Sequence, residues 1–342
     1  MAHIKHLLRA FAMVVAAGGA AALRAQDGAA APRQAVGDPS GHISIATTSE
    51  LAGLGEALAE GFRRHHPGVE TRVVSATKNP LLDPGHAEGS ASVVLSHALS
   101  GQQAGAAERL RGRPLSGAVA AGDAVAVFVH RDNPLALLTL PQVDALFSAE
   151  RRCGHQTDIS AWRDLGLTAE WAAKEVLLLA PPAGGDTSEY ARQVALCGGA
   201  YKPAVKELPT GTDVVAGVAG TVYGIGIAGI TRKSPGARAV PIARRGTESI
   251  TIGKWLIESH GIPTPDTEAY EPTPENIRLG NYPLARPVYV YLAETGGVTS
   301  DLAAELVRFV FASAGQDIVA GKGYVRLPAN VAADGLRRLG LQ

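Results

Sequence analysis

Hydroxyl and charged side chains gather where helices are expected to begin or strands to end. They form four groups: Thr47-Thr48-Ser49-Glu50, Ser75 with Thr77 and Lys78, Ser96-His97, and Gly185-Asp186-Thr187-Ser188. The first backbone N–H groups of a helix have no partner inside it and, with nearby hydroxyls, can receive an oxyanion. Each group alone is more typical of an ordinary cap or turn, and Thr47 with Glu50 has capping-box spacing. Together the groups indicate a cleft that can hold an anion.

Patterns that would indicate other chemistry are weak. Gly224, Gly226 and Gly229 match the dinucleotide-binding pattern G-x-G-x-x-G, but no helix start follows them, so we expect a glycine-rich strand or hinge. The ten histidines show no spacing typical of a metal site, and the sequence has no G-x-S-x-G segment. We therefore expect no metal, no cofactor and no catalytic residue, which argues against an enzyme.

The elements that must position these groups alternate between strands and helices. Strands are predicted at His42–Ala46, Glu70–Val74, Asp123–Val129, Val176–Leu179, Thr221–Ile227 and Pro287–Leu292. Helices are predicted at Leu51–His65, Leu140–Phe147, Thr187–Leu196, Asp213–Val218 and Ser300–Ala314. This alternation predicts an α/β fold with a mainly parallel sheet covered by helices on both faces.

Length, composition and charge narrow the class of protein. The 342 residues exceed what one small core usually holds, which favours two lobes. Hydrophobic residues make up 46% and charged residues 19%, as in a folded chain. The 32 basic and 32 acidic residues cancel, so no global positive field favours nucleic acid as a partner.

The N-terminal segment is typical of a secretory signal peptide. Lys5 and Arg9 precede the apolar stretch Ala10–Ala22, and small residues follow at a cleavage site near Ala25. The apolar stretch is too short to span a bilayer, so we expect no membrane span in the mature chain. Residues 1–25 are thus assigned to the signal peptide and 26–40 to a disordered lead-in. The mature protein is expected to be periplasmic or secreted.

Export also gives meaning to the two cysteines, Cys153 and Cys197. An even cysteine count in an oxidising compartment predicts one disulfide bond, and two buried free thiols are the alternative.

Several segments of the chain closely resemble the exported phosphate-binding subunit of bacterial phosphate ABC transporters. They lie between about residues 42 and 328, in the same order as in that family: Asp123–Pro134, Leu138–Ser148, Trp162–Gly166, Val214-Val215, Ala219, Gly224–Gly226, Asn281–Pro287, Arg308–Gln316 and Gly323-Tyr324. The resemblance implies a type 2 periplasmic-binding-protein fold, in which two α/β lobes joined by two crossover strands close on a ligand.

The same resemblance implies where the lobes begin and end. The first lobe would take residues 41–130 and 223–342, and the second lobe 131–222. The crossover strands would lie near Ala124–His130 and Val222–Ala228.

The ligand implied by the resemblance is phosphate or a related small oxyanion, delivered to an ABC permease. The family holds phosphate with hydroxyls, helix N–H groups and arginines; Thr48, Ser96 and Thr187 match its hydroxyl positions, whereas His97 and Ala180-Pro181 stand where its arginines are. We expect the cleft to be lined by Thr47, Thr48, Ser49, Ser75, Thr77, Ser96, Gly185, Thr187 and Ser188, with Lys78 or His97 as the cation. The alternative is a secreted interaction or accessory protein that keeps the scaffold but has a decayed phosphate site or binds another ligand.

Overall fold

A computed structural model describes residues 41–76, 78–83, 93–244, 268–292 and 300–342. The predicted signal peptide 1–25, the lead-in 26–40 and the candidate site residue Thr77 lie outside these ranges. Within them, no helix combines the length and the apolar character needed to cross a membrane.

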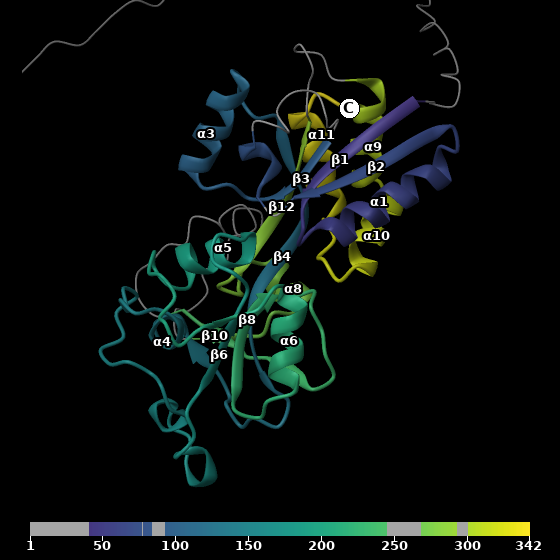
Figure 1. The fold of residues 1–342 in the computed structure, drawn as a ribbon. Coiled ribbons are helices and arrows are strands. Elements are labelled where there is room, and N and C mark those ends of the chain that lie inside the picture. The colour runs from purple at the N-terminus through teal and green to yellow at the C-terminus, as the bar shows by residue number, and fades with distance from the viewer. Residues whose placement is uncertain (1–40, 77, 84–92, 245–267, 293–299) are drawn as a thin grey trace, which may run out of the picture. The chain divides into compact units, whose positions relative to one another are not determined.

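Strands and helices alternate along much of the described chain (Figure 1). The strands are β1 (Gly41–Thr48), β2 (Val69–Ala76), β3 (Val93–His97), β4 (Gly117–His130), β5 (Leu138–Thr139), β6 (Leu177–Ala180), β7 (Lys206–Glu207), β8 (Gly224–Gly229), β9 (Ala237–Ala239), β10 (Ile242–Ala243), β11 (Ala269–Tyr270) and β12 (Ala285–Leu292). The α-helices are α1 (Ala52–His65), α3 (Gly101–Arg111), α4 (Leu140–Phe147), α5 (Asp186–Val194), α6 (Gly211–Ala219), α8 (Pro274–Arg278), α9 (Asp301–Phe311), α10 (Ser313–Gly321) and α11 (Ala329–Arg338). The predicted α/β class is confirmed.

The main sheet is mixed, which corrects the prediction of a mainly parallel one. Its strand order is β2-β1-β3-β12-β4-β8-β6-β7. β1 pairs in parallel with β2 and β3, and β6 pairs in parallel with β7 and β8. β12, however, runs antiparallel to both β3 and β4, and β4 runs antiparallel to β8. Alternation of strands and helices does not reveal these pairings, because β12 returns from far along the chain.

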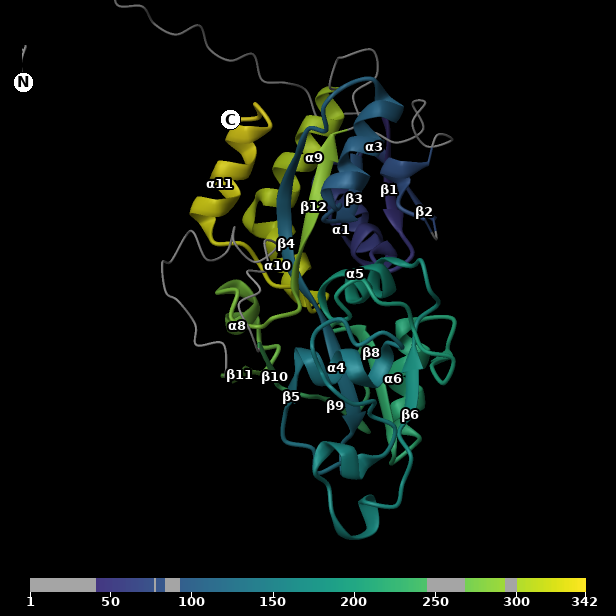
Figure 2. The ribbon, with the colours of Figure 1, turned by 90° about the vertical axis from the view of Figure 1, so that its left-hand side faces the viewer.

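Strand β4 belongs to both ends of this sheet. It has 14 residues; the stretch from Gly117 to Ala124 pairs with β12, and the stretch from Val125 to Val129 pairs with β8. In Figure 2, β4 runs from the region of β12 and α9 to that of β8 and α4. One continuous strand therefore connects two separately packed regions.

The first packed region surrounds β1, β3, β12 and the start of β4. Successive side chains of a strand point to opposite faces, so Ile43 and Ile45 of β1 face one core and Ala46 faces another. Helices α1, α9, α10 and α11 contribute to the core around Ile45. The opposite face is covered by the smaller cluster that contains Ala107 of α3, and Figure 1 shows α3 on the other side of these strands.

The second packed region is built around β8, α4, α5 and the end of β4. Its largest fully buried side chains include Trp162, Phe147 and Tyr282. Tyr282 lies between α8 and β12, in a part of the chain that the sequence prediction assigned to the first lobe. The lobe boundaries 41–130, 131–222 and 223–342 stay a prediction, but this packing favours a return to the first lobe near Ala285.

Two further sequence predictions concern single elements. The predicted helix Ser300–Ala314 is wrong in its length, since α9 ends at Phe311 and α10 starts at Ser313. Ala312 between them is extended, with ψ 163°, and its N–H donates to carbonyls of α9. The glycine-rich pattern at Gly224–Gly229 forms the buried strand β8, as predicted.

The predicted disulfide joins Cys153 to Cys197, with 5.4 Å between their Cα atoms. The bond links the segment that follows α4 to the segment that follows α5.

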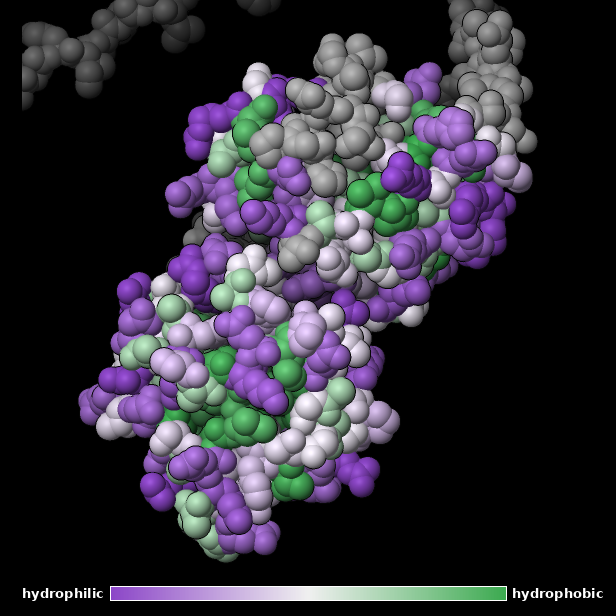
Figure 3. Space-filling view, in the orientation of Figure 1, coloured by the Kyte–Doolittle hydropathy of each residue, from purple (hydrophilic) through white to green (hydrophobic). Residues whose placement is uncertain are grey.

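The face of the molecule seen in Figure 3 is mostly hydrophilic, with separate hydrophobic areas. Leu110, Leu137, Leu177 and Val222 are the large hydrophobic side chains most exposed among the described residues.

Candidate functional site

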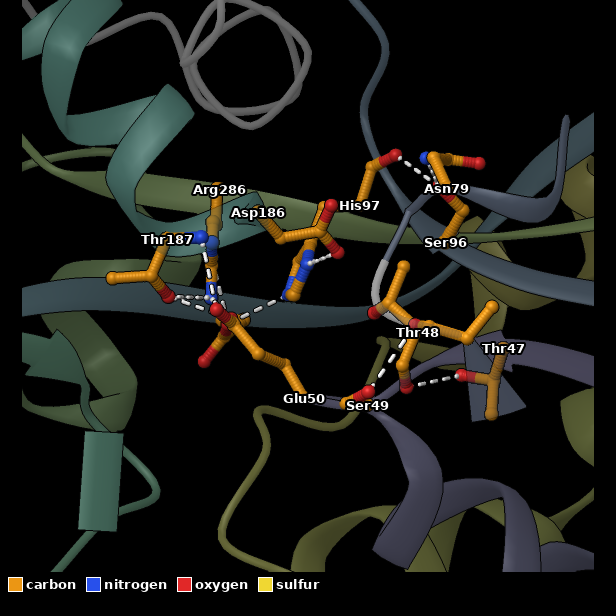
Figure 4. A network of polar contacts seen from close by, with 12 residues as sticks. Thr47, Thr48, Ser49, Glu50, Asn79, Ser96, His97, Asp186, Thr187 and Arg286 are labelled. Carbon is orange, nitrogen blue, oxygen red and sulfur yellow. Dashed lines mark hydrogen bonds and ion pairs between the residues drawn. The ribbon is translucent and has the colours of Figure 1, made fainter. Parts of the chain in front are cut away.

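A buried polar network forms where the ends of β1 and β3 meet the start of α5 (Figure 4). The paired strands β4 and β12 contribute one charged residue each, Asp123 and Arg286. The carboxyl ends of parallel strands meet at one edge of a sheet, which is why residues from β1 and β3 converge here. The network therefore connects the two packed regions of the fold.

Arg286 of β12 lies at the centre of this network. Its side chain is 2% exposed, and its Nε donates to Asp123 Oδ2 at 2.8 Å. Its Nη2 donates to Glu50 Oε2 at 3.1 Å and to Thr187 Oγ1 at 3.2 Å. The β12–β4 register places Arg286 directly opposite Asp123, so the ion pair is set by the strand pairing. Burial acts to lower the pKa of Arg286. The negative charges of Asp123, Glu50 and Asp186 together outweigh the effect of burial and raise this pKa.

Glu50 does not form the capping box predicted from its spacing to Thr47. The N-cap position of α1 is Leu51, which supplies no side-chain cap. The Glu50 carboxylate instead accepts from the backbone N–H of Thr187 at 2.9 Å and from the Thr187 hydroxyl at 2.6 Å. Long-range donors on α5 and β12 thus outcompete the local cap.

His97 lies between two carboxylates. Its Nε2 is 2.9 Å from Asp123 Oδ2 and its Nδ1 is 3.2 Å from Asp186 Oδ2, so an imidazolium would donate to both. Burial and the Arg286 charge act to lower the pKa of His97, but the contacts with Asp123 and Asp186 outweigh them and raise it above 6.5. His97 therefore joins β3 and β4 to α5 most strongly when it is protonated.

Both aspartates are held in their charged forms. Burial acts to raise the pKa of Asp123, but the charge of Arg286 and the hydrogen bond from His97 lower it to about 2. Burial likewise acts to raise the pKa of Asp186, and the hydrogen bond and charge of His97 lower it. Three carboxylates, counting Glu50, thus surround one arginine and one histidine.

The predicted hydroxyl groups have different surroundings. Thr187 and Thr48 are buried at the network, and the Thr48 hydroxyl lies beside Asp186 without a hydrogen bond of good geometry. Ser96 accepts from the Asn79 amide and donates to the His97 carbonyl, and Ser188 donates to the Pro181 carbonyl.

Two of the predicted residues lie away from the network. The methyl group of Thr47 faces Gly55 of α1 on the opposite side of β1, and Ser75 is exposed on β2. Ser49 is also exposed and donates to the Ala76 carbonyl. In Figure 4, Thr47 lies beyond Thr48 as seen from Arg286 and Thr187.

Two cavities flank the network. One of about 620 Å³ is lined by His97, Asn79 and Asp186, and one of about 450 Å³ by Thr48, Glu50 and Gly185. Lys78 lines both, and its side chain is exposed at their rim. Among the predicted site residues, Thr48, Ser49, Lys78, His97 and Gly185 line one or both of these cavities. Ser96, Thr187 and Ser188 are buried and line neither.

Sequence reasoning missed Arg286 and Asp123, although both lie in segments quoted for the resemblance. Lys78 or His97 was the cation predicted from the sequence, and the structure also places Arg286 of β12 in the network. A usable signal was present: each charged residue sits within or beside an apolar strand, and buried charges require opposite partners.

The pH dependence of folding should report the charge of His97. Because folding raises the pKa of His97, its stabilisation is complete below pH 6.5 and is lost as the pH rises through the higher folded-state pKa. The stabilisation from Asp123 and Asp186 is present above pH 3.8 and is lost as the pH falls. We expect the free energy of unfolding to be greatest between these limits.

Urea unfolding at a series of pH values measures this dependence. His97→Gln should be less stable than the parent and should lose most of the decline on the alkaline side. His42→Gln is the matched control, since that side chain is 83% exposed and should leave the profile unchanged. An alkaline decline that persists in His97→Gln would show that another group causes it.

Comparisons with known proteins agree with this architecture. A family model described as a PBP superfamily domain matches residues 32–314. The protein named phosphate-binding protein PstS from Pseudomonas aeruginosa is 35% identical over 341 residues, covering 99% of this chain and 99% of that protein. The crystal structure of an ABC-type phosphate transport receptor from Vibrio cholerae has a TM-score of 0.59 at 18% identity, covering 84% of this chain and 100% of that one. PstS from Borrelia burgdorferi has a TM-score of 0.52 at 13% identity, covering 84% and 99%. The predicted type 2 binding-protein fold is confirmed.

Proposed function

We propose that this chain, which belongs to the PBP superfamily and within it to the family of the phosphate-binding protein PstS, captures phosphate for an ABC transporter. The observation that carries the proposal is the 35% identity with the Pseudomonas aeruginosa protein over 341 residues. The match extends over nearly the whole of both chains, so it includes the segments that form the site as well as the scaffold.

The chemistry of the cleft supports anion capture. The N-terminus of α5, the Thr187 hydroxyl and the Arg286 guanidinium present donors within one buried region. A guanidinium and helix N–H groups are donors suited to phosphate oxygens. Binding would occur by closure of the two packed regions around the anion, with no covalent step and no catalytic role for the protein.

Calorimetric titration of refolded, phosphate-free protein tests this function. We expect saturable binding of one phosphate per chain, and phosphate at 100 times its dissociation constant should stabilise the fold by about 2.7 kcal/mol. Sulfate at the same concentration serves as the comparison anion. No heat and no thermal stabilisation up to millimolar phosphate would reject the proposal.

We also propose that the chain works outside the cytoplasm and delivers phosphate to an ABC permease. The sequence pattern of residues 1–25 and the disulfide between Cys153 and Cys197 support export. The mass of the protein recovered from a periplasmic fraction tests this: it should lack residues 1–25. Recovery of the full-length chain from the cytoplasm would contradict it.

One observation favours a second candidate function. Glu50, Asp123 and Asp186 place three carboxylates in the site, and a dianion would be repelled by any that stay charged. A scaffold whose phosphate site has decayed, acting as a secreted accessory protein or binding another ligand, would have this character. Thermal unfolding that is equally insensitive to phosphate and sulfate would favour it.

A further inference from the structure

The Glu50 carboxylate occupies the donors that an oxyanion would need. Its two oxygens accept from the Thr187 N–H at 2.9 Å, the Thr187 hydroxyl at 2.6 Å and Arg286 Nη2 at 3.1 Å. In all three contacts the partner group donates and a Glu50 oxygen accepts. A helix N–H, a hydroxyl and a guanidinium around one carboxylate form the type of site that receives phosphate oxygens.

Glu50 and Thr187 come from parts of the chain that pack in different regions. Glu50 follows β1 in the first region, whereas Thr187 is in α5, which packs in the second. The Glu50 backbone carbonyl also accepts from Arg232 Nη2 at 2.9 Å, which fixes the segment from its other side. The contact therefore joins the two regions directly, from the end of β1 to the start of α5.

Unused hydrogen-bonding groups remain beside this contact. Within the described residues, the hydroxyl of the buried Thr48 and Nη1 of the buried Arg286 have no hydrogen-bond partner of good geometry. Buried polar groups are normally paired, so the site has more donor capacity than Glu50 uses. The neighbouring cavity of about 450 Å³ is lined by both Thr48 and Glu50, so a ligand entering there would meet them together.

We propose that Glu50 is an internal competitor for the phosphate site: its carboxylate joins the two packed regions through the donors of Thr187 and Arg286, and it must leave those donors before phosphate can bind there. This inference rests on the proposed function, whose ligand is phosphate. It assigns to Glu50 control over affinity and over the closed state. The opposite role, in which Glu50 stays in place and strengthens phosphate binding, is an outcome of the test.

The test compares the parent protein with Glu50→Gln and Glu50→Ala by phosphate calorimetry. Glu50→Gln removes the negative charge at nearly constant size, and Glu50→Ala also empties the space. Glu56→Gln is the matched control, because it makes the same charge change on the exposed face of α1. We expect both Glu50 variants to bind phosphate at least about tenfold more tightly, the effect of losing one charge-assisted contact that competes with the ligand.

Small-angle X-ray scattering of the phosphate-free proteins gives a second readout that needs no ligand. The Glu50 variants should have a larger radius of gyration than the parent and Glu56→Gln, and phosphate should restore the smaller value. Thermal unfolding of each variant establishes that it is folded.

The outcomes separate the inference from the function on which it rests. If the parent and all variants bind phosphate equally, or if the Glu50 variants bind it more weakly, the inference is overturned and the proposed function stands. If no variant binds phosphate, the proposed function is overturned, whatever the scattering shows. Tighter binding in both Glu50 variants, with an unchanged control, supports the inference.

Discussion

Replacing Arg286 with alanine is expected to lower the free energy of unfolding by about 3–5 kcal/mol, because it leaves a buried carboxylate without its cation. Asp123 is 2% exposed, and its Oδ2 forms an ion pair with Arg286 Nε at 2.8 Å. The same substitution removes the donors that Arg286 offers to Glu50 and Thr187. Phosphate binding should therefore be lost along with stability.

Urea unfolding of the parent and Arg286→Ala measures the effect on stability. The matched control is Arg278→Ala on α8, whose ion pair with Glu275 is partly exposed and should change the free energy by no more than about 0.5 kcal/mol. The double variant Arg286→Met with Asp123→Leu should recover part of the loss, because the buried Asp123 carboxylate is removed together with the guanidinium that pairs with it. If Arg286→Ala were as stable as Arg278→Ala, the ion pair would not have the central role given to it here.

Removing the disulfide bond should lower the free energy of unfolding by about 4 kcal/mol in the chain-entropy model. Cys153 and Cys197 are 44 positions apart, and the bond restricts this loop in the unfolded chain. Cys153 is also tied locally, since its N–H donates to Asp144 Oδ2 at 2.6 Å. The second packed region should depend on the bond most.

The double variant Cys153→Ala with Cys197→Ala tests this by urea unfolding with and without a reductant. The reductant should destabilise the parent by nearly the same amount as the double substitution, and it should have no effect on the variant. A parent that loses less than about 1 kcal/mol on full reduction would mean that the reduced chain stays restricted by other contacts.

Local sequence patterns predicted many of the helices and strands but not how the strands pair. The spacing of the apolar residues Leu54, Leu58 and Phe62 predicted α1, because a helical repeat can be recognised from a few turns of local sequence. The antiparallel insertion of β12 between β3 and β4 joins residues far apart in the chain, and no local pattern carries that information. The mixed sheet could therefore not be predicted from alternation alone.

In the candidate site, too, local patterns identified some residues, whereas the roles of others depend on contacts between distant parts of the chain. The hydroxyl groups at Thr48 and Thr187 were found because helix starts have a recognisable composition. Glu50 was assigned to a local cap because its spacing fits one, yet donors on α5 and β12 hold it instead. Arg286 was overlooked as a site residue because its contribution depends on the register of β12 against β4.

Strand β4 exchanges its neighbour from β12 to β8 between Ala124 and Val125, one residue beyond Asp123. Any swing of one packed region about the other has to bend or twist the backbone at that point. The point at which the strand passes from one packed region to the other thus lies beside the buried Arg286–Asp123 ion pair, so a substitution there would change both the backbone between the regions and the donors of the site.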